Sequence, residues 1–449
     1  MIGGDQGANV FDSRPIGLMQ WRIFFLLALV AMVDGFNAQA LSIIAPALAS
    51  EWHFDSAVMT RLFVAALCGT AIGSCSFGWI ADRVGRKPVL LSALAVMGIF
   101  SFAAANSSTV FELGSFRFIE GVGLGAALPN ILTLTVEYSP ERHRNIMVNA
   151  VMCGFPVGGA VGGMIVGHLL HHYGWRSALV LGGVASLMLV PILALGLVES
   201  LRFLSTRNDA GAKIDSIMQK MGIREAIKLP TLRPQHTRVP VRAILSSELR
   251  FGTIVLWVMS ACANIIQYFL ISWSPWMLKA TGVSASEAAY GAVALGVGST
   301  LGALAIGRVM DRLGAYAVVA IGYLLSVFTI VGISFAIGLS MQVVLIAIFA
   351  AGVFVVGARF GVSALTTGYF PTQIRATGVS SCYGFSQVGS VLGPLVGGML
   401  ISIPLDYPSV FRFATIPAIL NAILGYALYR RLRSGQDRSI LVANLGGER

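Results

Sequence analysis

The sequence predicts an all-α membrane protein with twelve transmembrane helices in two six-helix bundles. Three observations support this fold class. First, 56% of the 449 residues are hydrophobic and 11% are charged, whereas soluble proteins carry about 25% charged residues. Second, twelve apolar runs are long enough to span a bilayer, which takes about 20 residues. Third, each half of the chain contains a similar pair of charged loops, which is typical of transporters built from two related halves.

The first half contains six of these apolar runs. A polar tail at residues 1–20, which we expect to be cytoplasmic, precedes them. Because no small-residue cleavage site follows the first run, we interpret that run as a retained helix and not as a signal peptide. The expected spans of this N-terminal bundle, residues 21–198, are 21–46, 58–80, 88–106, 111–137, 145–169 and 175–198.

The second half repeats this arrangement after a linker at residues 199–250, which we expect to be cytoplasmic. Within the linker, residues 215–221 have the pattern of a short amphipathic helix that could lie on the inner leaflet. A cytoplasmic tail is expected at residues 432–449. The expected spans of the C-terminal bundle, residues 251–431, are 251–276, 287–308, 315–337, 340–368, 377–402 and 409–431.

The charged residues predict the orientation of the chain. The net charge is +11, and the linker alone holds ten Lys or Arg residues, whereas the loops at 47–57, 107–110 and 338–340 hold none. Since cytoplasmic loops carry the excess of positive charge, both termini are expected to be cytoplasmic. Charges scattered over loops do not predict nucleic-acid binding. The five cysteines fall inside predicted spans, which favours helix packing, and no cofactor or metal is expected.

The charged loops have nearly the same spacing in the two halves. In the first half, Pro140 follows Asp82 by 58 residues, and in the second half Pro371 follows Asp311 by 60 residues. Each Asp belongs to a short charged turn between two apolar runs. The repeat therefore predicts that the two bundles share one architecture.

The turn at residues 78–87 resembles the signature loop of the major facilitator superfamily, and residues 117–123 resemble its fourth-helix motif. Segments elsewhere are similar to those of the aromatic acid:proton symporters, which include 4-hydroxybenzoate and 3-hydroxyphenylpropionate carriers: 34–37, 44–48, 123–130 and 369–379. The resemblance covers nearly the whole chain. It implies the major facilitator fold and a place in the bacterial inner membrane, and we expect a monomer. It also implies import of a small aromatic carboxylate with protons, by rocking of the bundles around a midplane site.

The chain departs from this family in its first span. The family motif usually reads Asp-Gly-x-Asp, and here the second acid is replaced by Asn37. Asparagine has nearly the shape of a protonated aspartic acid but does not titrate. Three interpretations stay open: coupling through another group, no proton coupling, or an engineered substitution that traps one state.

Ionisable side chains inside the spans are candidates for function, because they are unfavourable in lipid. Asp34 lies near the middle of the first span, with Asn37 on a similar face. We expect Asp34 to bind the proton, with Glu120 as second choice, and we place Asn37 in the substrate site. Arg117 can pair with Glu120 three residues on or can bind a carboxylate with its planar fork, which would free Glu120 to titrate. The structural alternative is polar groups that only tie helices together.

The C-terminal bundle supplies the other candidates for substrate binding. Arg359 has no acidic residue within its span, and such a guanidinium suits an anion; the alternative is snorkelling toward the cytoplasm. The corresponding region of hydroxybenzoate carriers does not favour arginine, so Arg359 is a candidate specificity determinant. Tyr268, Tyr383 and Gln387 are expected to hold the ring. Trp273 could bind the ring too, or could belong to an interfacial aromatic belt.

A cytoplasmic charged network is expected to close the inner gate and to break when the gate opens. This role rests on the superfamily resemblance. Asp82 is expected to accept hydrogen bonds at the start of a neighbouring helix, where the helix dipole favours an anion. The members of this network are Asp82, Arg83, Arg86, Glu137, Arg144, Asp311 and Arg375.

Two other classes of function fit parts of the sequence. A carrier of another organic anion, or a drug/proton antiporter, would share the fold. A receptor that binds an aromatic acid without transporting it would share the site, although the linker is short for a signalling domain. An enzyme is not expected, because no nucleophile, base and orienting group occur together.

Overall fold

The computed structural model describes residues 16–207, 211–221, 241–247, 249–280, 282–371, 374–403 and 406–433. All regular elements in these ranges are helices. Twelve of the helical segments are long and apolar enough to cross a membrane. The predicted fold class is therefore confirmed. Most of the N-terminal tail, of the linker and of the C-terminal tail lies outside the described residues.

The helices of the first half extend beyond several of the predicted spans. The first helix continues past Pro46 to Trp52, and the Ser50 hydroxyl donates to the Pro46 carbonyl at 2.8 Å. Hydropathy detects the apolar part of a helix only, and the polar turns beyond it escape detection. The helices are α2 (Leu18–Trp52), α3 (Ser56–Val84), α4 (Arg86–Ala105), α5 (Val110–Tyr138), η1 (Glu141–His143), α6 (Arg144–Met152), α7 (Gly154–Tyr173), α8 (Arg176–Gly196), α9 (Leu201–Ser205) and α10 (Gly211–Lys220).

The helices of the second half include one irregular span. The tenth span is divided by a π-helical turn, η3 (Gly352–Val356), which widens the helix just before Arg359. Such turns occur often at functional sites. The other helices are η2 (Val241–Leu245), α11 (Arg250–Ala280), α12 (Ala285–Leu313), α13 (Ala315–Ala336), α14 (Met341–Ala351), α15 (Gly357–Tyr369), α16 (Arg375–Ser402), α17 (Tyr407–Phe413) and α18 (Thr415–Arg433).

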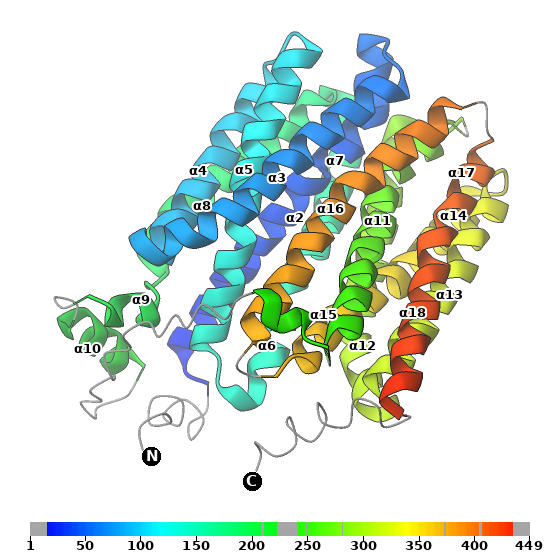
Figure 1. Cartoon of the computed structure of the whole chain (residues 1–449). Helices are drawn as coiled ribbons and strands as arrows, with labels where there is room; N and C mark the ends of the chain where they lie inside the picture. The colour runs from blue at the N-terminus through cyan, green and yellow to red at the C-terminus, as the bar shows by residue number, and fades with distance from the viewer. Residues whose placement is uncertain are drawn as a thin grey trace. The chain divides into compact units, whose positions relative to one another are not determined.

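The chain forms two compact units. Unit 1 comprises Met1–Ala38, Cys68–Gly158 and Arg176–His236, and unit 2 comprises Gln39–Leu67, Gly159–Trp175 and Thr237–Arg449. Within unit 1, α4 packs against α5 and α8, and within unit 2, α11 packs against α16 and α18 (Figure 1). The units do not coincide with the halves of the sequence, because unit 2 takes in parts of α2, α3 and α7. The division into bundles at 21–198 and 251–431 stays a prediction.

Aromatic rings and small residues hold the first-half segments within unit 2. The rings of Phe63 and Trp273 meet edge to face, with centroids 5.4 Å apart. Gly398 lies against Thr60 so closely that a Cβ atom at Gly398 would collide with the hydroxyl. Trp273 is fully buried and donates its indole N–H to the Pro394 carbonyl at 3.0 Å. The interpretation of Trp273 as part of an interfacial belt is therefore wrong.

Candidate functional site

A cluster of buried polar side chains lies within unit 1. It contains Asn37 from α2, Arg117 and Glu120 from α5, and Ser186 from α8. Three of the residues proposed from the sequence therefore come together in one place, although α2 and α5 are separated by two helices along the chain. Asp34 lies three residues before Asn37 on α2 and, like these three residues, is at most 3% exposed.

Arg117 connects α5 to α2 through its guanidinium. Its Nη1 atom lies 2.8 Å from Oε2 of Glu120, and Nη2 donates to the main-chain oxygen of Asn37 at 2.9 Å. The pairing of Arg117 with Glu120 that the sequence allowed is thus present. Because Glu120 offsets the charge of Arg117, this arginine has little electrostatic capacity left for an anionic ligand in the described arrangement.

Asn37 joins α2 to α8. Its Nδ2 atom donates to the Val33 carbonyl at 2.9 Å and to the Ser186 hydroxyl at 3.1 Å. Its Oδ1 atom lies against Gly182, where a Cβ atom would collide with it. The Nδ2 group of the amide therefore faces the Val33 carbonyl, so this position needs a hydrogen-bond donor. An ionised carboxylate has no proton to donate there, so asparagine takes the place that a protonated acid could fill.

Asp34 and Glu120 each have one carboxyl oxygen that makes no hydrogen bond to the described residues. These atoms are Oδ1 of Asp34 and Oε1 of Glu120, and both are buried. A buried oxygen without a partner is unfavourable by about 1–3 kcal/mol, and in native structures such atoms call for an explanation such as a functional role. Protonation of the carboxyl group, or a bound ligand, would satisfy either oxygen.

A second polar cluster lies within unit 2, on α11, α15 and α16. Arg359 donates from Nε to Oδ1 of Asn264 at 2.7 Å. Asn264 in turn donates from Nδ2 to the Ser386 carbonyl at 2.8 Å and to the Ser390 hydroxyl at 3.0 Å. The Ser390 hydroxyl also lies 3.4 Å from Oε1 of Gln387. The structure thus connects Arg359 and Gln387, which were proposed separately, through Asn264 and Ser390.

The charge of Arg359 has no acidic partner among the described residues. Its Nη1 and Nη2 atoms make no hydrogen bond there either, and the side chain is half-buried. Tyr268 follows Asn264 by one turn of α11, and Tyr383 precedes Gln387 by one turn of α16; both are half-buried. Their role in binding a ring stays a prediction.

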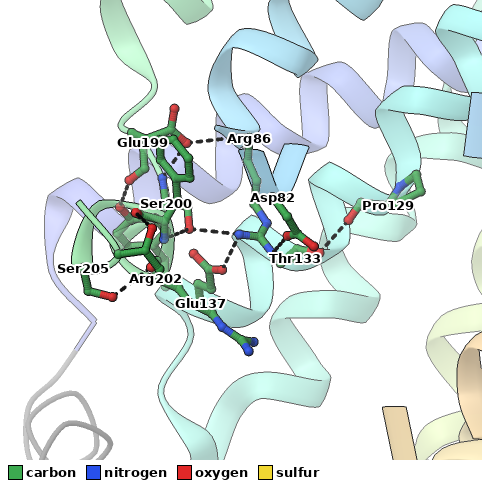
Figure 2. Close-up of polar contacts among 12 residues, drawn as sticks. Asp82, Arg86, Pro129, Thr133, Glu137, Glu199, Ser200, Arg202 and Ser205 are labelled. Carbon is green, nitrogen blue, oxygen red and sulfur yellow. Dashed lines mark hydrogen bonds and ion pairs between the residues drawn. The ribbon is translucent and has the colours of Figure 1, made fainter. Parts of the chain in front are cut away.

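A charged cluster joins α3, α4, α5 and the segment after α8 (Figure 2). Arg86 lies at its centre, because its guanidinium is 3.2 Å from Oε1 of Glu137 and 3.4 Å from Oδ1 of Asp82. Arg86 also donates from Nη1 to the Ser200 hydroxyl at 3.1 Å. Three members of the proposed gating network therefore come together here.

Glu199 is a member of this cluster that the sequence interpretation missed. Its Oε1 atom accepts from the backbone N–H groups of Arg86 at 2.9 Å and Lys87 at 3.2 Å, so it caps the N-terminus of α4. In return, Nζ of Lys87 donates to the Ala194 and Leu197 carbonyls at the end of α8, both at 2.7 Å. The carboxylate at the start of α4 is thus Glu199, whereas Asp82 contacts Arg86. The sequence held one signal for this role, because Glu199 is an acidic residue directly after the sixth expected span, and a carboxylate is favourable near a helix N-terminus.

Three other proposed network members, Arg83, Arg144 and Arg375, have contacts of their own. Arg83 stacks on Trp79, 3.7 Å from the ring centroid. Arg144 pairs with Glu141 at 3.6 Å. Arg375 donates from Nε to the Phe370 carbonyl at 3.2 Å, and no ion pair of the described residues includes Arg375 or Asp311. The gating role of all seven residues stays a prediction.

Comparison with known proteins gives consistent matches over most of the chain. The Major Facilitator Superfamily profile matches residues 27–298 and 256–443. The gallate transporter of Pseudomonas putida is 36% identical over 418 residues, which is 92% of each chain. The 4-hydroxybenzoate transporter PcaK of Pseudomonas aeruginosa is 35% identical over 91% of this chain and 92% of its own. The xylose transporter XylE of Escherichia coli, in an inward open conformation, superimposes with a TM-score of 0.70 at 16% identity, covering 91% of this chain and 96% of XylE.

Proposed function

This chain belongs to the Major Facilitator Superfamily and, within it, to the aromatic acid transporters, and from that premise we propose that it imports a small, hydroxybenzoate-like aromatic carboxylate by proton symport. It is a multi-pass membrane transporter and not an enzyme. The relatives include a gallate transporter and a 4-hydroxybenzoate transporter, which supports a benzoate with ring hydroxyls as the substrate.

The distribution of buried charge supports an anionic substrate. Arg117 is offset by Glu120 at 2.8 Å, whereas Arg359 has no acidic partner among the described residues. A guanidinium whose paired Nη atoms are available can hold a carboxylate through two parallel hydrogen bonds. Arg359 is therefore the group that binds the substrate carboxylate, and Arg117 orders the polar cluster of unit 1.

The unpaired carboxyl oxygens support a proton site in unit 1. Asp34 has no ion-pair partner in the described part of the chain, and Glu120 already pairs with Arg117. Asp34 is therefore the first proton carrier and Glu120 the second. Import of a monoanion with one proton moves no net charge, so the proton gradient drives it and the membrane potential does not.

The orientation follows from the basic loops. Cytoplasmic loops carry the excess of positive charge. The cytoplasmic side is therefore the side of the basic loops, which contain Arg83, Arg86, Lys87 and the Lys and Arg residues of the linker. With twelve spans, both termini lie on that side of the bacterial inner membrane. The protein works as a monomer, because each chain carries both the arginine and the carboxyl groups that the reaction needs.

Uptake of radiolabelled 4-hydroxybenzoate and gallate into proteoliposomes tests this function. We expect accumulation against the substrate gradient when the outside is acidic, its loss on adding a protonophore, and no uptake by protein-free vesicles. The Arg359→Gln variant should bind the substrate much more weakly. Accumulation that does not depend on the pH gradient would contradict symport. Binding without uptake would indicate a receptor. If no benzoate were bound or taken up, the substrate would be another organic anion.

A further inference from the structure

We propose that Asn264 is a positioning residue, which holds Arg359 by its Nε atom so that the Nη1 and Nη2 atoms together receive the substrate carboxylate. This inference rests on the proposed function, because it assumes that Arg359 binds an aromatic carboxylate. It adds which edge of the guanidinium is used and which residue sets that edge. It also assigns a role to Asn264 of α11, which the sequence analysis did not place in the site.

The amide of Asn264 is fixed on both sides. Its side chain is 3% exposed, and Nδ2 donates to the Ser386 carbonyl and to the Ser390 hydroxyl, which is 1% exposed. These two acceptors on α16 determine which end of the amide is the donor. The Oδ1 atom must then face Arg359, and it accepts from Nε at 2.7 Å.

The contact with Asn264 selects one edge of the guanidinium. A guanidinium can hold a carboxylate either through Nε and one Nη atom or through both Nη atoms. Asn264 occupies Nε, so the first edge is blocked and the second stays available. The same bond ties Arg359 to α11 and disfavours the alternative in which the side chain snorkels toward the cytoplasm.

An amide at position 264 holds the arginine without cancelling its charge. A carboxylate in the same place would accept from Nε equally well, but it would form an ion pair with Arg359 and compete with the substrate. Asn264→Asp is therefore an informative variant. It preserves the side-chain shape and the acceptor for Nε, but it neutralises the positive charge of Arg359 that the substrate carboxylate requires.

The experiment measures KM and Vmax for 4-hydroxybenzoate uptake in proteoliposomes of the full chain, together with the dissociation constant in detergent by calorimetry. We expect Asn264→Ala to raise KM by about tenfold or more, the effect of weakening one hydrogen-bonded charge contact, with little change in Vmax. Asn264→Asp should raise KM at least as much. Ser274→Ala is the matched control on α11, because in the described part of the chain its hydroxyl bonds only to Leu270 of the same helix.

The double variant separates positioning from general structure. In the Arg359→Gln background, Asn264→Ala should cause no further loss of affinity, because no guanidinium remains to be positioned. An equal loss in both backgrounds would overturn the inference, and so would normal affinity in Asn264→Asp. If Asn264→Ala does not fold, Ser390→Ala replaces it, since it removes one of the two contacts that orient the amide; a several-fold rise in KM is expected, and an unchanged KM would overturn the inference.

The outcomes also distinguish this inference from the proposed function. If the unmodified chain neither binds nor transports an aromatic carboxylate, the proposed function fails and the inference fails with it. If uptake is normal and Arg359→Gln retains full affinity, transport stands, and only the assignment of Arg359 and Asn264 is overturned.

Discussion

Two buried or half-buried arginines have opposite electrostatic settings in this protein. Arg117 is paired with Glu120 and bonded to the Asn37 carbonyl, whereas Arg359 is held by the neutral amide of Asn264. The residue type alone does not distinguish a structural arginine from a ligand-binding one. What distinguishes them is whether a neighbouring carboxylate has already neutralised the charge.

Removal of Arg117 alone should destabilise the protein strongly. Arg117→Met would leave the Glu120 carboxyl group buried without its partner, and breaking a buried ion pair in this way lowers stability by about 3–5 kcal/mol. Arg117→Met combined with Glu120→Leu should be less destabilising, because no unpaired charge remains. The free energy of unfolding, measured by denaturant titration in detergent micelles, checks both values.

The control for this comparison is Arg61→Met on α3. Arg61 is exposed, and its Nε atom bonds only weakly, at 3.4 Å, to a carbonyl of its own helix, so its loss should change stability by less than about 0.5 kcal/mol. If the double variant were as unstable as Arg117→Met, the pair would stabilise the protein through contacts other than mutual neutralisation.

At the scale of helices, α4 and α8 cap one another. Glu199, just beyond α8, accepts from the first N–H groups of α4, and Lys87, in the first turn of α4, donates to the last carbonyls of α8. Helix ends leave such groups without partners inside the helix. Gly85, with φ of 110°, makes the tight turn between α3 and α4 that brings the N-terminus of α4 to Glu199.

Loss of the Glu199 cap should destabilise the contact between α4 and α8. Glu199→Ala removes the acceptor of three backbone N–H groups, two of them in the first turn of α4 and the third that of Ser200, and loss of a helix cap lowers stability by about 0.5–2 kcal/mol. Glu199→Gln keeps an acceptor and should lose less. Unfolding in micelles measures the difference, with Asp311→Ala as control, because Asp311 is exposed and belongs to no ion pair of the described residues. Equal stability of Glu199→Ala and the control would contradict the capping role.

At the scale of the whole molecule, the fold was predictable because lipid imposes a simple rule. Each span must satisfy its backbone internally and present about 20 apolar residues, so the twelve helices could be located from hydropathy. The repeated loops around Asp82 and Asp311 supported two related halves. Hydropathy alone did not place the helix ends, the π turn before Arg359, or the inclusion of Gln39–Leu67 in unit 2.

The candidate site was predictable in part. Asp34, Arg117, Glu120 and Arg359 were identifiable because charged groups are rare inside spans. Their partners were not identifiable, since a contact such as Arg359 with Asn264 joins residues 95 positions apart. The sequence around each residue does not indicate such long-range contacts. A neutral amide such as Asn264 also cannot be distinguished, by residue type alone, from the other polar residues in the spans.

The last prediction concerns the coupling of the whole transport cycle and starts from Asn37. The amide donates to the Val33 carbonyl at 2.9 Å, and an aspartic acid in the same place could make this bond only while protonated. Asn37→Asp should therefore add a proton that binds when this arrangement forms and leaves when it breaks. Import would then move two protons with each monoanion, and each cycle would carry one net positive charge inward.

The measurement is uptake into proteoliposomes in which a potassium gradient and an ionophore set the membrane potential. The unmodified chain should be insensitive to an inside-negative potential, whereas Asn37→Asp should gain a driving force of about 2.3 kcal/mol per 100 mV. Asn130→Asp is the control, because Asn130 is also buried and donates to a carbonyl one turn back, in Ala126, yet it lies outside the cluster. If Asn37→Asp were as insensitive to potential as the unmodified chain, position 37 would carry no proton, and its amide would serve only to join α2 to α8.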